Sequence, residues 1–191
     1  DGMRLWVDGL RLIDPWDIII DNSTQFIASN GTNPITFTSD SLNVPSTAPS
    51  HLNAGTVSGA LSGGTSVIVD TSGSGTQAGN IVVQGSILTT NAASTNLTLK
   101  AHNNIYLQAG SRIESSVGAL NVTLNSDQDA SGAGAVSFNG ASIITNGGNL
   151  VIGGGANPLT GFASSAADPA FGNLNSGVSL FNSAISTGAG N

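Results

Sequence analysis

The side chains that could carry out acid–base catalysis are few in this chain of 191 residues, and they are scattered along it. Glycoside hydrolases and lyases need clustered carboxylates that donate a proton, accept one, or attack the substrate. Glu114 is the only glutamate, and Asp14 and Asp17, although close in sequence, flank Pro15 within an apolar segment. We therefore interpret these two aspartates as solvated turn residues and not as a catalytic pair.

The histidines and glycines also lack the neighbours that catalysis or phosphate binding would require. His51 and His102 are the only histidines, and neither has the serine and aspartate that a triad needs nearby in the sequence. His102 precedes Asn103, a pattern typical of a solvated corner. The glycines at positions 73, 75 and 79 form a loop that no helix follows, so they do not predict a phosphate-binding turn.

One segment resembles the beginning of a calcium-binding loop. Asn125, Asp127 and Asp129 alternate in the expected way, but the sixth position is Ala130 and the twelfth is Val136, where such a loop carries glycine and glutamate. The sequence thus predicts no metal-binding, cofactor-binding or catalytic residue, and it predicts that the protein is not an enzyme.

The composition combines a weak charge with a substantial share of apolar residues. Only 8% of the residues are charged, the net charge is −7 with four Lys and Arg, and there is no cysteine. This charge disfavours binding to nucleic acids or to anionic membranes. The absence of cysteine rules out disulfides and thiolate zinc sites and is compatible with export through a bacterial periplasm. No apolar run is long enough for a signal peptide or a membrane span, so we expect Asp1 to be an internal or processed start.

Three short strand-like phrases recur in a fixed order and would have to position any functional residue. The first phrase occurs at 96–99, 121–124 and 149–152; the second at 80–83, 104–107, 136–138 and 178–180; the third at 87–89, 113–115, 143–145 and 185–187. Apolar residues alternate within the phrases, which is the period of a β-strand. The cycle predicts an all-β fold, a three-sided β-solenoid (parallel β-helix) of about four to five coils with inserted loops.

The chain divides into two parts according to whether the three patterns recur regularly. Residues 1–65 form an entering or capping segment with irregular strands and loops, in which 10–20 is either a first coil or a cap over an open edge, and 51–61 is a short helical turn or a loop. Residues 66–191 form the regular solenoid. An insert at 153–177 is too polar for a strand and should project. Phe162 and Phe171 either fold back against the sheet, which we favour, or form a contact surface on the projecting loop.

Asparagines precede several of the phrases at predicted corners. Because their side chains can bond to neighbouring backbone, repeated copies should stack as an asparagine ladder. The alternative reading is glycosylation, since four asparagines fit the N-x-[ST] pattern: Asn22, Asn30, Asn96 and Asn121.

The phrases from 79 to 155, and the upstream block Ile13–Ile20, resemble the repeat region of filamentous-haemagglutinin-type adhesins, the exoproteins of two-partner secretion. The likeness rests on segments such as Asn96-Leu-Thr-Leu-Lys-Ala-His-Asn-Asn-Ile-Tyr-Leu107 and Thr145-Asn-Gly-Gly-Asn-Leu-Val-Ile152. It implies a right-handed parallel β-helix exported to the surface of a Gram-negative bacterium and used in cell adhesion, filaments or biofilm. The secretion domain of that family is not recognisable here.

We therefore expect a secreted structural or adhesive module without cofactors. Its partners would be neighbouring repeats of a longer chain, surface glycans or proteins, or further copies of itself stacked head to tail into filaments. Two alternatives remain open: a β-helix enzyme or tailspike fragment that acts on polysaccharides, and a glycan-binding module without catalysis.

Overall fold

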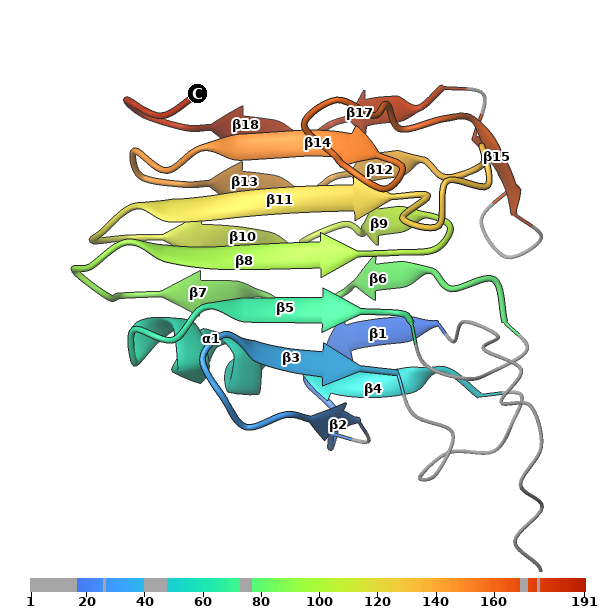
Figure 1. Ribbon diagram of the computed structural model, residues 1–191. Helices are drawn as coiled ribbons and strands as arrows, with labels where there is room; N and C mark the ends of the chain where they lie inside the picture. Colours follow the sequence, from blue (N-terminus) through green and yellow to red (C-terminus); the bar gives the residue numbers. More distant parts are fainter. Residues whose placement is uncertain (1–16, 26, 40–47, 73–76, 169–171, 175) are drawn as a thin grey trace, which may run out of the picture.

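The protein consists mainly of β-strands arranged in three largely parallel sheets around one core, with a single helix among the described residues (Figure 1). The computed structural model describes residues 17–25, 27–39, 48–72, 77–168, 172–174 and 176–191. The expectation of an all-β fold with parallel sheets is confirmed.

Most neighbouring strands within a sheet are distant in sequence. The strands of each sheet follow in their spatial order. Sheet A contains β4 (Ser50–Asn53), β1 (Ile18–Asp21), β6 (Ile81–Val83), β9 (Ile105–Leu107), β12 (Val136–Asn139) and β17 (Val178–Phe181). Sheet B contains β2 (Ala28–Ser29), β3 (Ile35–Thr38), β5 (Val67–Asp70), β8 (Thr95–Lys100), β11 (Leu120–Ser126) and β14 (Leu150–Gly154). Sheet C contains β7 (Ile87–Thr89), β10 (Arg112–Ser115), β13 (Ser142–Ile144) and β18 (Ala184–Ser186).

The chain visits the sheets in rotation from β6 onward: A, then C, then B. Each copy of a phrase pairs in parallel with the next copy of the same phrase, as in Leu97 with Val122 and Val122 with Leu150. The second and third phrases pair in the same way in sheets A and C. The three phrases therefore correspond to the three sheets, as the sequence predicts.

The alternating apolar residues stack on one another inside the sheets. Ile81, Ile105 and Val136 occupy one register position of sheet A, and all three side chains are fully buried. Equivalent stacks run through sheets B and C and merge into one hydrophobic cluster. Since each fully buried aliphatic side chain contributes about 1.5–3 kcal/mol, these stacks dominate the stability of the fold.

Asparagine ladders do form at two corners. In the buried ladder, the backbone N–H of Asn80 donates to Asp17 Oδ1 at 2.7 Å, that of Asn104 donates to Asn80 Oδ1 at 3.0 Å, and that of Ala135 donates to Asn104 Oδ1 at 2.8 Å. An outer ladder runs along the start of strands β8, β11 and β14. Asn121 Nδ2 donates to Asn96 Oδ1 at 3.0 Å, and the backbone N–H groups of Asn149 and Asn191 donate to the Oδ1 atoms of Asn121 and Asn149. The ladders satisfy backbone donors where the chain turns.

The helix α1 (Ala54–Ser62) closes the sheets at the end where the described chain begins. Asn53 caps its N-terminus, accepting from the N–H groups of Gly55 and Thr56. The hydroxyl groups of Ser58 and Ser62 accept hydrogen bonds from the backbone at β7: from Leu88 N within the strand at 3.0 Å, and from Thr90 N directly after it at 3.3 Å. The helix thus takes the place of a further strand of sheet C.

The first part of the chain differs from the expectation in detail. The segment 51–61 contains the end of β4 and most of a regular helix instead of a short turn or loop. Ile18–Ile20 belong to β1, which lies inside sheet A between β4 and β6 and not over an open edge. Residues 10–16 lie outside the described residues.

The insert after β14 also departs from the expectation. β15 (Ala166–Asp168) and β16 (Gly172–Leu174) form a two-stranded antiparallel sheet, so the segment is not too polar for strands. Phe162 does not fold back, because its side chain is 86% exposed. Phe171 lies outside the described residues.

Candidate functional site

A serine, a histidine and an aspartate meet at the ends of β1 and β4. Pairing of these strands brings His51 beside Asp21 although 30 residues separate them, and His51 Nδ1 lies 2.9 Å from Asp21 Oδ2. Ser23 follows β1 and places its Oγ 3.2 Å from the same ring nitrogen. This cluster was not identified from the sequence, because Asp21 and His51 are neighbours only through the pairing of β1 with β4.

The geometry of this cluster differs from that of a catalytic triad. In a triad the serine and the carboxylate contact opposite nitrogens of the imidazole, so that a proton can pass from serine to histidine. Here both groups contact Nδ1, and Ser23 Oγ donates directly to Asp21 Oδ1 at 2.6 Å. Burial raises the pKa of Asp21, but hydrogen bonds from Ser23 and His51 outweigh it and lower the pKa. The cluster ties β1 to β4.

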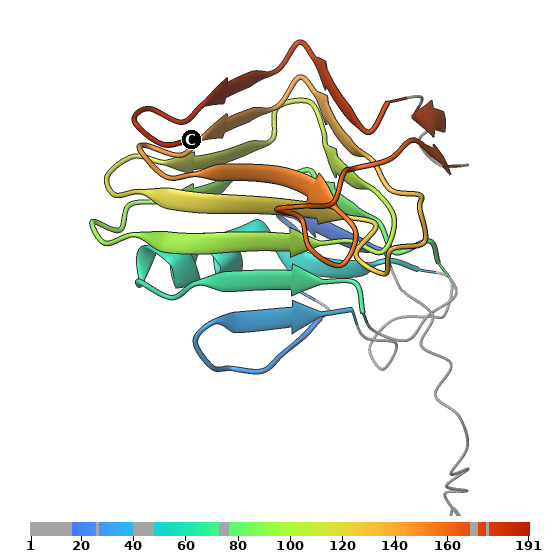
Figure 2. The ribbon, with the colours of Figure 1, turned by 45° about the horizontal axis from the view of Figure 1, so that its top comes forward.

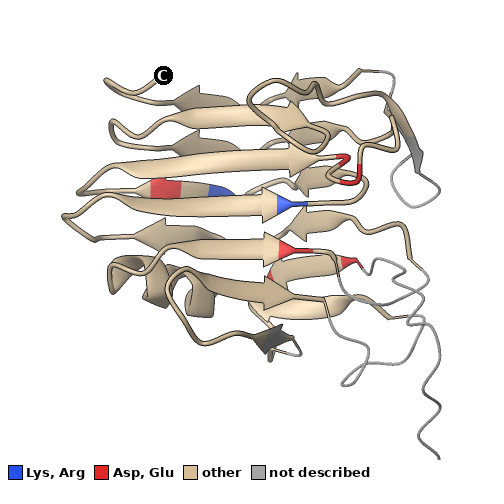
Figure 3. Ribbon diagram, viewed as in Figure 1, with Lys and Arg blue, Asp and Glu red and all other residues tan. Residues whose placement is uncertain are grey.

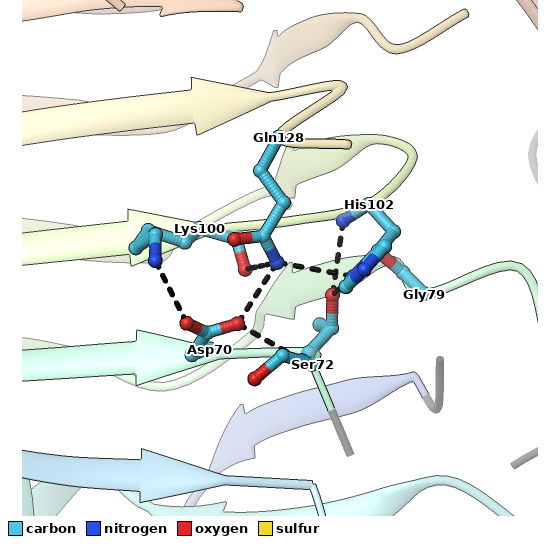
Figure 4. Close-up of polar contacts among 7 residues, drawn as sticks. Asp70, Ser72, Gly79, Lys100, His102 and Gln128 are labelled. Atoms are coloured by element: carbon cyan, nitrogen blue, oxygen red, sulfur yellow. Dashed lines mark hydrogen bonds and ion pairs between the residues drawn. The ribbon is translucent and has the colours of Figure 1, made fainter. Parts of the chain in front are cut away.

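A larger polar cluster crosses three strands of sheet B at their carboxyl ends (Figure 4). Asp70 ends β5 and is buried, and its Oδ2 accepts from Lys100 Nζ of β8 at 2.9 Å. Its Oδ1 accepts from Gln128 Nε2 at 2.8 Å and from the N–H of Ser72 at 2.9 Å. Burial raises the pKa of Asp70, but the hydrogen bonds from Gln128 and Lys100 and the charge of Lys100 lower it overall.

His102 belongs to the same cluster and is not the solvated corner residue that the sequence predicted. Its Nδ1 lies 3.0 Å from Gln128 Nε2 and 3.0 Å from Thr71 Oγ1, and its backbone N–H donates to Thr71 Oγ1 at 2.9 Å. Because an amide nitrogen only donates, the contact with Gln128 requires Nδ1 to act as an acceptor. The ring thereby links the segments that follow β5, β8 and β11 in sheet B.

In the segment that resembles a calcium loop, the Asp127 carboxylate is hydrogen-bonded by residues of the same segment. Asp127 is buried, and its Oδ1 accepts from Ser131 Oγ at 2.8 Å and from the N–H of Gly132 at 3.0 Å. Within the described ranges, no three His, Cys, Asp or Glu side chains gather closely enough to hold a metal ion.

The other residues that the sequence singled out lie apart from these clusters. Glu114 pairs with Arg112 on β10. Asp17 is part of the buried ladder instead of a solvated turn, since it accepts from Asn80. Asp14 and the glycines at 73 and 75 lie outside the described residues.

The most exposed apolar side chains of the described chain lie on the loop that follows β14. Leu159 is exposed like Phe162, and Asn157 orders the turn between them by accepting from Leu159 N at 3.1 Å and, through its carbonyl, from Gly161 N at 2.7 Å. The hydrogen bond from Gly154 N to Gly161 O joins the loop to β14. A rigid turn that presents two apolar side chains is suited to contact another surface.

Comparison with known proteins adds no assignment: no protein-family model matches this chain, and no curated protein matches it significantly. Among the described residues, no helix has both the length and the hydrophobicity that a transmembrane span requires.

Proposed function

We propose that this chain is a right-handed, three-sided parallel β-helix that serves as a structural and adhesive module of a Gram-negative surface protein. In this proposal it is exported to the cell exterior and acts without catalysis. One observation carries the proposal: three strand types recur in rotation and each stacks in register on its own kind. Parallel strands joined through crossovers are right-handed in nearly all known proteins, which supports the handedness.

The resemblance to filamentous-haemagglutinin-type repeats supports the location and role. A stack of coils with buried apolar columns and hydrogen-bonded corners is stiff and extended, as a surface shaft must be. The loop at 155–165, with Leu159 and Phe162 exposed, supplies a contact point on this shaft.

The β-helix can be tested by distances along its axis. Because the chain lacks cysteine, pairs of introduced cysteines can carry spin labels specifically. Thr36, Thr98, Thr123 and Val151 occupy one register column of sheet B. We expect the backbone separation from Thr36 to grow by about 4.8 Å for each strand, to about 19 Å at Val151. Broad distributions, or distances that do not increase in this order, would contradict the stacked coils.

Adhesion can be tested with fluorescent beads coated with the protein and applied to epithelial cells and to bacterial lawns. We expect the double variant Leu159→Ser with Phe162→Ser to lose most of the retention. The matched control, Leu88→Ser with Val117→Ser, removes two exposed apolar side chains elsewhere and should retain beads as the unaltered protein does. Retention no greater than that of albumin-coated beads would refute the adhesive role.

A further inference from the structure

We propose that Asn30, which precedes Gly31, is a site of spontaneous covalent modification, where the side-chain amide is converted into a carboxylate. The pair lies in the loop between β2 and β3, coloured blue at the lower end of the stack in Figure 2. The reaction depends neither on the proposed function nor on an enzyme, because the backbone supplies the attacking atom and water is the only co-reactant.

The backbone nitrogen of Gly31 is the nucleophile of this reaction. After it loses its proton to hydroxide, it attacks Asn30 Cγ, and an electron pair of the C=O bond moves onto Oδ1. The pair then returns, the Cγ–Nδ2 bond breaks, and ammonia leaves with a proton from water, which gives a cyclic imide. Water opens the imide to aspartate or isoaspartate. The attack is favoured because both groups belong to adjacent residues.

The Asn30 side chain is folded back over the backbone of Gly31. Its Oδ1 accepts from Thr32 N at 3.2 Å, as in a turn where a side chain accepts from the backbone two residues later. The same oxygen accepts from Thr36 N at 2.9 Å, while Nδ2 donates to Pro34 O at 3.4 Å. Two N–H groups therefore point at the oxygen that becomes negative, and they stabilise its charge as the donors of an oxyanion hole do.

The attacking nitrogen is accessible to solvent. Gly31 is exposed, and its N–H donates to no acceptor within the described ranges. Its φ is +67°, and no atom beyond its chain neighbours lies within 4 Å of the place that a Cβ would occupy. Figure 3 shows the loop without a charged residue, and residues 28–38 contain no Asp, Glu, Lys or Arg. Hydroxide can thus reach the N–H without repulsion from a neighbouring carboxylate.

Two other Asn-Gly pairs are protected by backbone hydrogen bonds. In Asn139-Gly140 the glycine N–H donates to Phe181 O, and in Asn146-Gly147 it donates to Thr187 O, both at 2.8 Å. Each of these bonds must break before the nitrogen can lose its proton and attack. The three pairs are alike in sequence, and the hydrogen bonds of the folded chain distinguish Asn30 from the other two.

An aspartate at position 30 would fit the loop. Its carboxylate retains an oxygen that accepts from Thr32 N and Thr36 N, and it loses only the longer bond to Pro34 O. Isoaspartate would lengthen the backbone after position 30 by a methylene group and disturb the pairing of β2 with β3. Either product adds a negative charge to the net charge of −7.

The test incubates the folded full chain in mildly alkaline buffer made with heavy-oxygen water and follows each Asn-Gly peptide by mass spectrometry. We expect Asn30 to convert at least about tenfold faster than Asn139 or Asn146, because only the latter two require a backbone hydrogen bond to open. Each converted peptide should carry heavy oxygen. In the chain unfolded by urea, the three pairs should convert at similar rates.

Anion-exchange chromatography with matched variants provides the second readout. Asn30→Gln keeps an amide but must close a larger ring, so the early acidic species should disappear. The control Asn146→Gln should leave that species in place. The proposal would be overturned by equal rates at the three pairs in the folded chain or by earlier conversion at Asn139 or Asn146. Slower conversion of Asn30 in the folded chain than in urea would also overturn it, since the loop would then protect the amide.

Discussion

The hydrophobic core is covered differently at the two ends of the sheets. At one end, α1 replaces a strand, its serines accept from β7, and the last inward side chains are buried. At the other end, β17 and β18 continue the stacks of the coil below, but Leu180 and Ile185 are partly exposed. The comparison shows how a segment outside the repeat can cover the repeat: α1 packs against β7 and supplies hydrogen-bond acceptors that a further strand would otherwise provide.

The largest expected effect tests this difference within one register column. Phe138→Ala should cost about 3–5 kcal/mol of unfolding free energy, because it removes a fully buried ring between neighbouring coils. Leu180→Ala, one strand further along, should cost about 1 kcal/mol or less, because this side chain is already half-exposed. Urea denaturation measures both. Equal losses would show that Leu180 on β17 contributes as much to stability as the buried Phe138.

The next effect compares the two asparagine ladders. Asn104→Ala should cost about 1–3 kcal/mol, because it leaves the buried N–H of Ala135 without its partner. Asn121→Ala at the outer ladder should cost less, since water can replace the lost bond to the N–H of Asn149. Thermal or urea unfolding measures both losses. A greater loss of unfolding free energy for Asn121→Ala would show that the outer ladder contributes more to stability than the buried one.

A smaller effect tests the helix that closes the first end. Ser58→Ala with Ser62→Ala removes the acceptors of Leu88 N and Thr90 N, at about 1 kcal/mol for each bond. Hydrogen exchange of these two amides should accelerate, and the amides of the neighbouring strand β10 should not. Unchanged exchange at Leu88 would mean that the hydroxyl groups do not protect this edge.

The smallest expected effect is on the stability of the fold at acidic pH. Folding lowers the pKa of Asp70 and Asp21 below the ordinary 3.8, so their carboxylates stabilise the fold above that pH. This contribution is lost as the pH falls from about 3.8 through the lowered values, because the unfolded state binds the protons first. Asp70→Asn should therefore show a shallower loss of melting temperature in this range. The exposed Asp129→Asn serves as the control, and an equal change in both variants would contradict the role of Asp70.

The regular part of the structure was predictable because its signal is local. Each phrase contains its own alternation, and copies of the same phrase pair with one another, so the stacking of Leu97 on Val122 follows from the repeat. The asparagine ladder was predictable for the same reason, since each corner repeats the residue that bonds to the next.

The irregular part was not predictable because its contacts join unlike segments. Nothing in the residues around Asp21 identifies His51 as a neighbour, since that contact depends on the pairing of β1 with β4. The Asp21-x-Ser23 spacing, typical of a turn in which a side chain accepts from the backbone, was the one local sign. In α1, the serines at positions 58 and 62 lie four residues apart on one face, but only the structure shows that this face meets β7.

The position of β1 constrains the order in which the chain can fold. Ile18 pairs with Ser50 on one side and with Ile81 on the other, so its second neighbour lies 63 residues later in the chain (81 − 18). During synthesis from the N-terminus, β1 emerges before both β4 and β6, and it cannot be enclosed until β6 has left the ribosome. Contacts between such distant residues slow folding because a long loop must close before they form. From β6 onward each strand pairs with the next copy of its own pattern, so these strands can pair progressively, whereas β1 is enclosed only once both β4 and β6 are available.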